Sequence, residues 1–205
     1  MNATTINAGL IALAGFASLG LAAPAAAQSK PAASSLAASP AQLQSAQSEL
    51  GFTSRQMGVP VEGRFKRFDA KLSFDPKKPE AAQVAFTIDL NSVALGAPEL
   101  EAELAKAPWF DSKKLAQASF VSTAVKATGA AKFEVTGRLT IKGQTRDITV
   151  PIGLSQAGTA TTANGGFVLK RLEFKIGDGE WADTSMVANE VQVKFKLAFT
   201  GIAAL

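Results

Sequence analysis

Apolar and polar residues alternate with a period of two along most of the chain beyond residue 48, which is the pattern of a β strand with one buried face. The last segment shows it most clearly, because Val191, Val193, Phe195, Leu197 and Phe199 are separated by single, mostly polar residues. Eight such segments follow one another, and we expect a strand in each. They span residues 50–54, 61–74, 84–90, 120–125, 133–141, 148–154, 167–176 and 191–199.

Turn-forming residues separate several of these segments. The turns are expected at residues 75–78, 128–129, 143–144 and 164–166. Within the second segment the alternation slips by one position between Phe65 and Phe68. A slip of this kind is typical of a β bulge, so we expect one strand with a bulge there.

One segment breaks the alternation. Residues 98–108, PELEAELAKAP, begin with a proline, carry acidic residues in the first turn and end with Pro108. Leu100 and Leu104 are four residues apart and therefore share one face of a helix. Proline at the start and acidic residues in the first turn favour a helix beginning. The segment predicts a short amphipathic helix between the third and fourth strands.

Eight antiparallel strands with one apolar face must bury that face, in either a sandwich or a closed barrel. A barrel also removes exposed strand edges, and a barrel of eight strands has room for one small elongated ligand. An outer-membrane barrel is the alternative, but it needs aromatic girdles at both membrane interfaces. This chain has two Trp and no Tyr. We therefore expect an all-β fold with its apolar face inside and its lysine-rich face in water.

The first 40 residues differ from the rest. An apolar run ends at Ala25-Ala26-Ala27, a small-residue pattern typical of a secretory cleavage site, and predicts a signal peptide over residues 1–27 and a periplasmic location. Its first seven residues carry no Lys or Arg, which leaves an upstream start or an uncleaved anchor as alternatives. Residues 28–40 are rich in Ala, Ser and Pro and predict a flexible leader. The folded domain is then expected over residues 41–205.

Composition excludes several kinds of function. The chain has no Cys, His or Tyr, so it lacks the usual ligands of transition metals and haem and the usual thiol and general acid-base groups. We expect no cofactor and no bound metal. The formal net charge is +4, and the basic residues are scattered. A nucleic-acid-binding protein would cluster them on one surface, so we expect no nucleic-acid partner.

The acidic groups give weak catalytic hypotheses. Asp69 and Asp75 form one grouping, and Asp178, Glu180 and Asp183 form another. A carboxylate pair is typical of glycoside hydrolases, yet the sequence does not show the separation between the carboxyl groups that they require. The second grouping resembles a calcium loop without its twelve-residue spacing. We expect no enzyme, and the alternative of a hydrolase that uses Asp178 or Asp183 predicts that Asp183→Asn abolishes turnover while lipid binding persists.

Phenylalanine is abundant in the expected barrel. Twelve of the 13 Phe follow the signal peptide, and no Tyr supplies a polar group beside them. Each single Phe is explained by a filled core, but the whole set favours a tunnel for an apolar chain, since pockets for polar ligands need placed hydrogen-bonding groups.

The sequence resembles the YceI-like family of periplasmic polyisoprenoid-binding proteins over about residues 41–200. The motifs that carry the resemblance are GRFKRF at 63–68 with FDP at 74–76, FD at 110–111 and GRLTIKGQTR at 137–146. The resemblance implies a lipocalin-like, eight-stranded antiparallel barrel with one short helix between strands 3 and 4. It also implies that the central tunnel holds a long isoprenoid tail.

Where the family shows NRxDFGIG, this chain has KRLEFKIG at 170–177, which keeps Arg171 and Phe174 but lacks the Asp and a Gly. Arg146, at the end of the GQTR motif, and Arg171 are therefore candidate head-group contacts, with a structural salt bridge as the alternative role for each. The apolar residues expected to line the tunnel are Phe52, Phe65, Phe86, Ile88, Leu100, Leu104, Trp109, Phe110, Phe120, Leu139, Ile141, Ile148, Phe174 and Phe195.

These patterns lead to one functional hypothesis and one alternative. The hypothesis is an exported carrier or store of a prenyl lipid, either a polyisoprenoid or an isoprenoid quinone, with a transient membrane contact near Trp109 and Phe110. The alternative is a non-enzymatic periplasmic accessory protein that acts through its surface, for instance with a membrane redox partner. The sequence leaves the oligomeric state open between monomer and homodimer.

Overall fold

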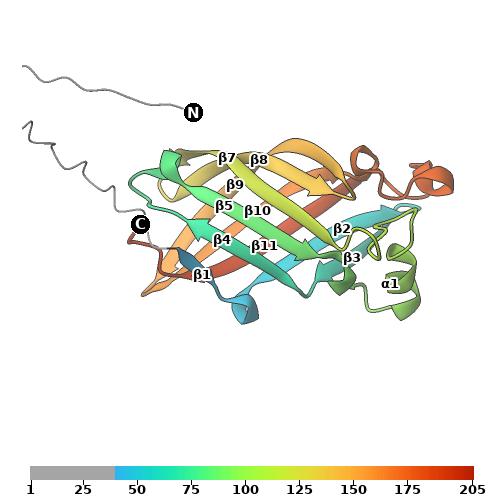
Figure 1. Ribbon diagram of the computed structural model, residues 1–205, viewed down its shortest axis with the longest axis horizontal. Coiled ribbons are helices and arrows are strands. Elements are labelled where there is room, and N and C mark those ends of the chain that lie inside the picture. Colours follow the sequence, from blue (N-terminus) through green and yellow to red (C-terminus); the bar gives the residue numbers. More distant parts are fainter. Residues whose placement is uncertain (1–39) are drawn as a thin grey trace, which may run out of the picture. The chain divides into compact units, whose positions relative to one another are not determined.

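The computed structural model describes residues 40–205, and in this part of the chain eleven strand segments form one antiparallel sheet that closes into a barrel (Figure 1). Neighbouring segments follow the order β1-β4-β5-β7-β8-β9-β10-β11-β2-β3-β6, and β1 also pairs with β11. The segments are β1 (Ala41–Leu43), β2 (Glu49–Gln56), β3 (Val59–Phe65), β4 (Phe68–Ser73), β5 (Gln83–Asp89), β6 (Val93–Ala94), β7 (Gln117–Gly129), β8 (Lys132–Ile141), β9 (Gln144–Ala157), β10 (Ala160–Lys170) and β11 (Glu190–Thr200).

The eleven segments make a barrel of eight strands, as the sequence predicts. The 3₁₀ helix η1 (Ser45–Gln47) only interrupts one strand between β1 and β2. Lys66 and Arg67 likewise interrupt one strand between β3 and β4. Because β6 has two residues, it adds no full strand. The barrel closes on β11, which pairs with β1 near one end and with β2 near the other.

The slip between Phe65 and Phe68 is a strand break, so the predicted bulge is wrong. The backbone N–H groups of Lys66 and Arg67 leave the ladder and donate to Ser92, to its carbonyl and to its Oγ, each at 3.0 Å. On one side of the break β3 pairs with β2 and β6, and on the other side β4 pairs with β1 and β5. The break thus lets one strand exchange partners as the barrel closes.

The seventh strand has bounds that differ from the prediction. β10 spans Ala160–Lys170, and the 3₁₀ helix η4 (Arg171–Phe174) follows it. The turn predicted at residues 164–166 is also wrong, because these residues pair with β11 in mid-strand. Gly165 lies opposite Phe195, and a Cβ at Gly165 would come within 2.4 Å of that ring. The glycine therefore makes space for an aromatic ring, and the chain turns at Gly158 instead, where φ is +61°.

The other predicted turns lie close to their expected places. Asp75 receives hydrogen bonds from the N–H groups of Lys77 and Lys78. The turn predicted at 128–129 falls at residues 130–131, because Gly129 still belongs to β7. Lys142 and Gly143 both have positive φ, +48° and +72°, which is the two-residue hairpin turn that matches strand twist.

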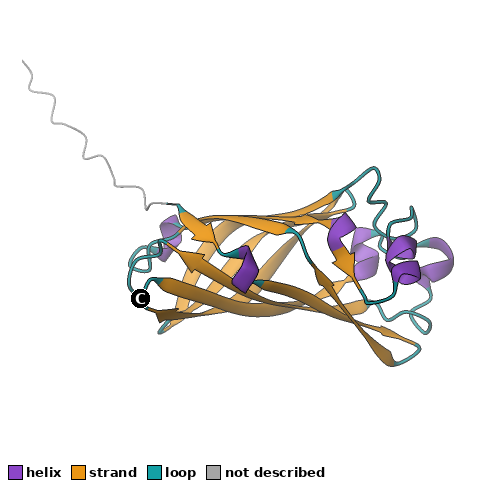
Figure 2. Ribbon diagram, turned by 90° about the horizontal axis from the view of Figure 1, so that it is seen from below, coloured by secondary structure: helices purple, strands orange, loops and turns teal. Residues whose placement is uncertain are grey.

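The helix α1 (Pro98–Leu104) lies between the third and fourth strands, which confirms the prediction. The 3₁₀ helices η3 (Leu90–Ser92), η4 and η5 (Gly179–Ala182) gather with α1 at one end of the barrel, opposite the C-terminus (Figure 2). We call the end with α1 the helix end and the other the terminus end. The 3₁₀ helix η2 (Pro79–Ala81) lies between β4 and β5 in the chain.

Buried apolar side chains form two clusters in the barrel interior, one towards each end. Within residues 40–205, no helix has the length and apolar character needed to cross a membrane. The signal peptide expected at residues 1–27 lies outside the described residues, and so does the expected leader apart from Pro40.

Candidate functional site: two apolar chambers in the barrel

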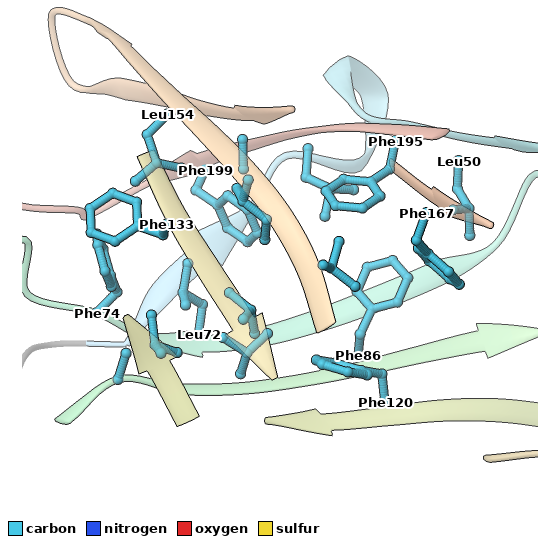
Figure 3. Close-up of a pocket in the computed structure, with 18 of the residues that line it drawn as sticks. Leu50, Leu72, Phe74, Phe86, Phe120, Phe133, Leu154, Phe167, Phe195 and Phe199 are labelled. Carbon is cyan, nitrogen blue, oxygen red and sulfur yellow. The ribbon is translucent and has the colours of Figure 1, made fainter. Parts of the chain in front are cut away.

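The barrel interior holds a cavity of about 160 Å³, which we call chamber A. Every residue that lines chamber A is apolar. Its volume is close to the roughly 150 Å³ of an engineered apolar cavity that stays dry and binds benzene. Figure 3 shows side chains from several strands pointing into it. Seven phenylalanines line it: Phe74, Phe86, Phe120, Phe133, Phe167, Phe195 and Phe199.

A second cavity of about 140 Å³, chamber B, lies towards the helix end. Leu104 of α1 and the following Trp109 and Phe110 line it together with barrel strands. Unlike chamber A, chamber B has polar residues in its lining, Ser54 and Arg171. Five residues line both chambers and form a waist between them: Leu50, Ile88, Leu139, Phe167 and Val193.

Inward-facing glycines make room for the aromatic rings. Phe52 lies directly across from Gly63, as Phe195 does from Gly165. A Cβ at Gly63 would come within 2.3 Å of the Phe52 ring, so that ring lies flat against the wall only because Gly63 has no side chain. The cavities thus exist in part because glycines lie beneath phenylalanines.

Arg171 is buried at the border of chamber B, with 2% of its surface exposed. Its Nε donates to the carbonyl of Ala188 at 3.1 Å. Its Nη1 and Nη2 donate to four more carbonyls at 2.6–2.9 Å. All five N–H donors of the guanidinium are therefore used within the protein, none of them on a carboxylate. Burial lowers the pKa of Arg171 from its usual value.

This arrangement gives Arg171 a structural function. The four further acceptors are the carbonyls of Ile176, Gly177, Trp181 and Val187, so one side chain holds the whole segment after η4. The structural salt bridge considered for Arg171 is wrong, because carbonyls take the place of an acidic partner. No N–H of Arg171 is left to donate to a head group.

Arg146 lies elsewhere. It is exposed, and its Nη1 donates to the carbonyl of the preceding Thr145 at 2.7 Å. It pairs across the ladder with Leu139, so its Cβ is on the inner side of the sheet, near the end of the β8–β9 hairpin. Arg146 lines neither chamber.

The barrel wall is incomplete beside Arg146. β9 pairs with β10 only from Ile152 onward, and β10 pairs with β9 only up to Gly165. Beyond these residues the two strands diverge, and η4 contacts β9 there. Lys142 links the same region to the helix end: its Nζ donates to the carbonyls of Lys175 at 2.6 Å and Pro108 at 3.2 Å and lies 3.8 Å from a carboxylate oxygen of Asp178.

Most apolar residues expected to line the tunnel do line a chamber. Leu100 lines neither and is 47% exposed, because α1 covers the barrel with its last turn, which carries Leu104, and leaves its first turn in solvent. Phe174 lines neither because it is fully packed, 2% exposed, in the core cluster behind chamber B. The others line chamber A (Phe86, Phe120, Ile148, Phe195), chamber B (Phe52, Phe65, Leu104, Trp109, Phe110, Ile141) or both (Ile88, Leu139).

The sequence-based set also missed lining residues. The period of two already marked many of them as inward-facing, so this signal was present for Leu72, Phe74, Val84, Phe133 and Val150. Phe167 is the first residue of the predicted seventh segment but was not included in the set. Ala82 and Ile202 lie outside the strands, where no periodicity points to them.

The acidic groups considered as catalytic candidates include Asp183, on the loop that follows η5. Within residues 40–205, no three acidic groups gather as a metal site. Asp183 accepts hydrogen bonds from the N–H and Oγ of Ser185 at 2.8 and 2.7 Å, and these bonds lower the pKa of Asp183. Its carboxylate therefore stabilises its own loop.

Comparison with known proteins places the chain in a family. The YceI-like domain profile matches residues 42–199. A UPF0312 protein of Pseudomonas putida (strain W619) is 39% identical over 89 residues, 43% of this chain and 46% of the relative. Protein YceI of Salmonella arizonae is 38% identical over 96 residues, 47% of this chain and 50% of the relative. The aligned stretches thus span about half the length of these curated relatives.

Two solved structures share the fold. Burkholderia cenocepacia BcnA is 44% identical, with a TM-score of 0.75 over 77% of this chain and 99% of that one. A polyisoprenoid binding domain from Saccharophagus degradans, implicated in plant cell wall breakdown, is 18% identical, with a TM-score of 0.64 over 80% of this chain and 98% of that one. At that identity the likeness shows the fold alone. With the profile match over most of the barrel, the chain belongs to the YceI-like family.

Proposed function

We propose that this protein is an exported, non-enzymatic lipid-binding protein that holds a long prenyl chain, a polyisoprenoid or an isoprenoid quinone, for carriage or storage. The observation that carries the proposal is the pair of chambers along the barrel, of which chamber A has an entirely apolar lining. Such a lining offers no hydrogen bond, so it favours a hydrocarbon chain over a polar metabolite. The polyisoprenoid-binding description of the Saccharophagus degradans structure supports the same class of ligand.

The size of the chambers indicates how a long tail is held. Each is smaller than the roughly 300–1,000 Å³ of typical ligand pockets. A long tail therefore needs both chambers. Phe167 and Val193 line both of them, so a tail that extends from one chamber into the other would contact these two side chains.

The energetics favour exchange over permanent capture. Burial from water gains about 0.8 kcal/mol per CH₂ group, but a tail in a bilayer is already out of water. Transfer between bilayer and barrel is then nearly neutral in free energy, which suits a carrier. Contact with the bilayer is expected at the helix end, where Met57, Val59, Leu100 and Met186 are between 42% and 67% exposed.

The proposal is tested by filling chamber A without adding a charge. Ala163 is 7% exposed and lines chamber A, whereas its neighbour Asn164 on β10 is exposed. Ala163→Phe places a ring in the chamber, and Asn164→Phe places the same ring outside. Native mass spectrometry of detergent-free protein, with identification of the extracted lipid, should find a stoichiometric prenyl lipid in the wild type and in Asn164→Phe but not in Ala163→Phe.

Circular dichroism must show that both variants are folded. A wild type that stays free of lipid after incubation with quinones and polyprenols would rule out the proposal, as would lipid retained equally in both variants.

A further inference from the structure

Both chambers are mainly apolar, and the few polar groups that border one of them give a bound lipid a direction. Within residues 40–205 the polar lining residues, Ser54 and Arg171, and the indole of Trp109 all belong to chamber B. Chamber A has none. A polar head group buried without a hydrogen bond loses free energy, so it avoids chamber A. Chamber B can accommodate it.

The indole N–H of Trp109 is an unused hydrogen-bond donor. It is buried, and among the described residues it is the buried side-chain nitrogen or oxygen that has no hydrogen-bond partner. Native proteins leave few such groups, and each calls for an explanation. Trp109 lines chamber B, so an oxygen of a bound molecule is a suitable partner.

The ring of Trp109 is held in place from several sides. It packs against Trp181 with ring centroids 5.5 Å apart. A Cβ at Gly177 would come within 2.9 Å of the ring, so the glycine backbone is packed against it. The backbone N–H of Trp109 donates to the carbonyl of Lys106 at 3.0 Å. A ring fixed in this way cannot turn its N–H towards solvent, and it is preorganised for a ligand.

The charge of Arg171 adds to the preference for an oxygen atom. Its guanidinium has no carboxylate within salt-bridge distance in the described part of the chain, and its donors are used by carbonyls. Its positive charge is therefore balanced only by carbonyl dipoles. Because the site is buried, the positive potential of the guanidinium favours an electron-rich or anionic atom nearby.

We propose that chamber B binds the polar end of the lipid, with the Nε1–H of Trp109 donating to a carbonyl or phosphate oxygen of the head group and the tail extending into chamber A. The assignment rests on the proposed function and deepens it. It gives the ligand class as a prenyl lipid with an oxygen acceptor at its head, and it makes Trp109 the residue that selects for that acceptor.

The first test uses the two indole N–H signals of the chain, which has two Trp. Trp181→Phe identifies the signal of Trp109 in ¹H–¹⁵N spectra. Delipidated protein is loaded separately with a tetraprenyl benzoquinone, a tetraprenyl monophosphate and a tetraprenyl hydrocarbon. The Nε1–H proton of Trp109 should move downfield with the quinone, the phosphate or both, and stay near its unloaded position with the hydrocarbon. Whichever head group produces the shift identifies the source of the oxygen.

The second test removes the donor and keeps the ring. Trp109→Phe should weaken binding of the shifting ligand about tenfold, equivalent to ~1.4 kcal/mol, while hydrocarbon affinity changes little. Val168→Ala changes an exposed residue of β10 that lines neither chamber, and it should leave both affinities unchanged.

The outcomes separate the two proposals. Hydrocarbon and head-group lipids that bind equally, without a shift of the Trp109 signal, would overturn the head-group site and leave the lipid carrier standing. If none of the three compounds binds, the carrier proposal fails, and the head-group site fails with it.

Discussion

Replacing Gly63 by alanine should push a phenylalanine into the tunnel. The new Cβ would lie 2.3 Å from Cζ of Phe52 and 2.8 Å from Cδ2 of Leu95, whereas ordinary contacts begin near 3.4 Å. The Phe52 ring, which lines chamber B, must move by more than 1 Å off the wall. Overpacking of this kind costs about 1–3 kcal/mol. Loss of glycine flexibility in the unfolded chain offsets about 0.4–1 kcal/mol of it.

The net loss of about 1–2 kcal/mol should lower Tm by about 2–8 °C in a domain of this size. Gly153→Ala is the matched control, since no heavy atom lies within 4 Å of the Cβ position at Gly153 and its φ is not left-handed. Its Tm should stay the same or rise slightly. Thermal unfolding of the delipidated proteins, followed by circular dichroism, measures both values, and prenyl-lipid affinity should fall several-fold for Gly63→Ala only. Equal Tm and equal affinity in the two variants would refute the idea that glycines keep these rings against the wall.

Four further changes test other parts of the structure. Arg171→Lys reduces five donors to three and should lower the free energy of unfolding in urea by about 2–5 kcal/mol, because buried carbonyls lose their partners; a change under about 0.5 kcal/mol would contradict the structural function. Lys142→Met frees the β8–β9 turn from the carbonyls of Lys175 and Pro108 and should speed lipid release several-fold in a stopped-flow assay, while the exposed Lys196→Met should not. Val59→Glu should slow lipid transfer to vesicles without reducing retention, and Val121→Glu, at a position on the barrel side that is 46% exposed against 62% for Val59, should leave transfer unchanged. Burial raises the pKa of Asp89, but the hydrogen bond from Arg67, the hydrogen bond from the backbone N–H of Asn91 and the charge of Arg67 together lower it by more. The stabilisation that the Asp89 carboxylate gives is therefore present above its pKa in the unfolded chain and is lost as the pH falls through its lower pKa in the folded protein. Asp89→Asn should flatten the fall in Tm below about pH 4, and an unchanged slope would contradict this.

The prediction of strands from the sequence succeeded where each strand buries one face. β11, β8 and the inward residues of β9 follow the period of two closely, because each inward side chain meets the barrel interior and each outward one meets water. The same pattern, with the abundance of phenylalanine and the absence of Tyr, His and Cys, predicted an apolar interior. Prediction failed at Gly165, where glycine signals a turn in sequence but in the structure lies beneath Phe195 in mid-strand.

The sequence by itself determined the alternation, the number of strands, the short helix and the kinds of chemistry that the chain lacks, because these depend on local spacing and composition. Only the tertiary structure decided that Lys66 and Arg67 break a strand and let it change partners, that five carbonyls of the segment after η4 surround Arg171, and that Trp109 keeps an unpaired N–H beside chamber B. These features depend on which segments meet when the barrel closes. Contacts between residues far apart in the chain leave no periodic signal in the sequence.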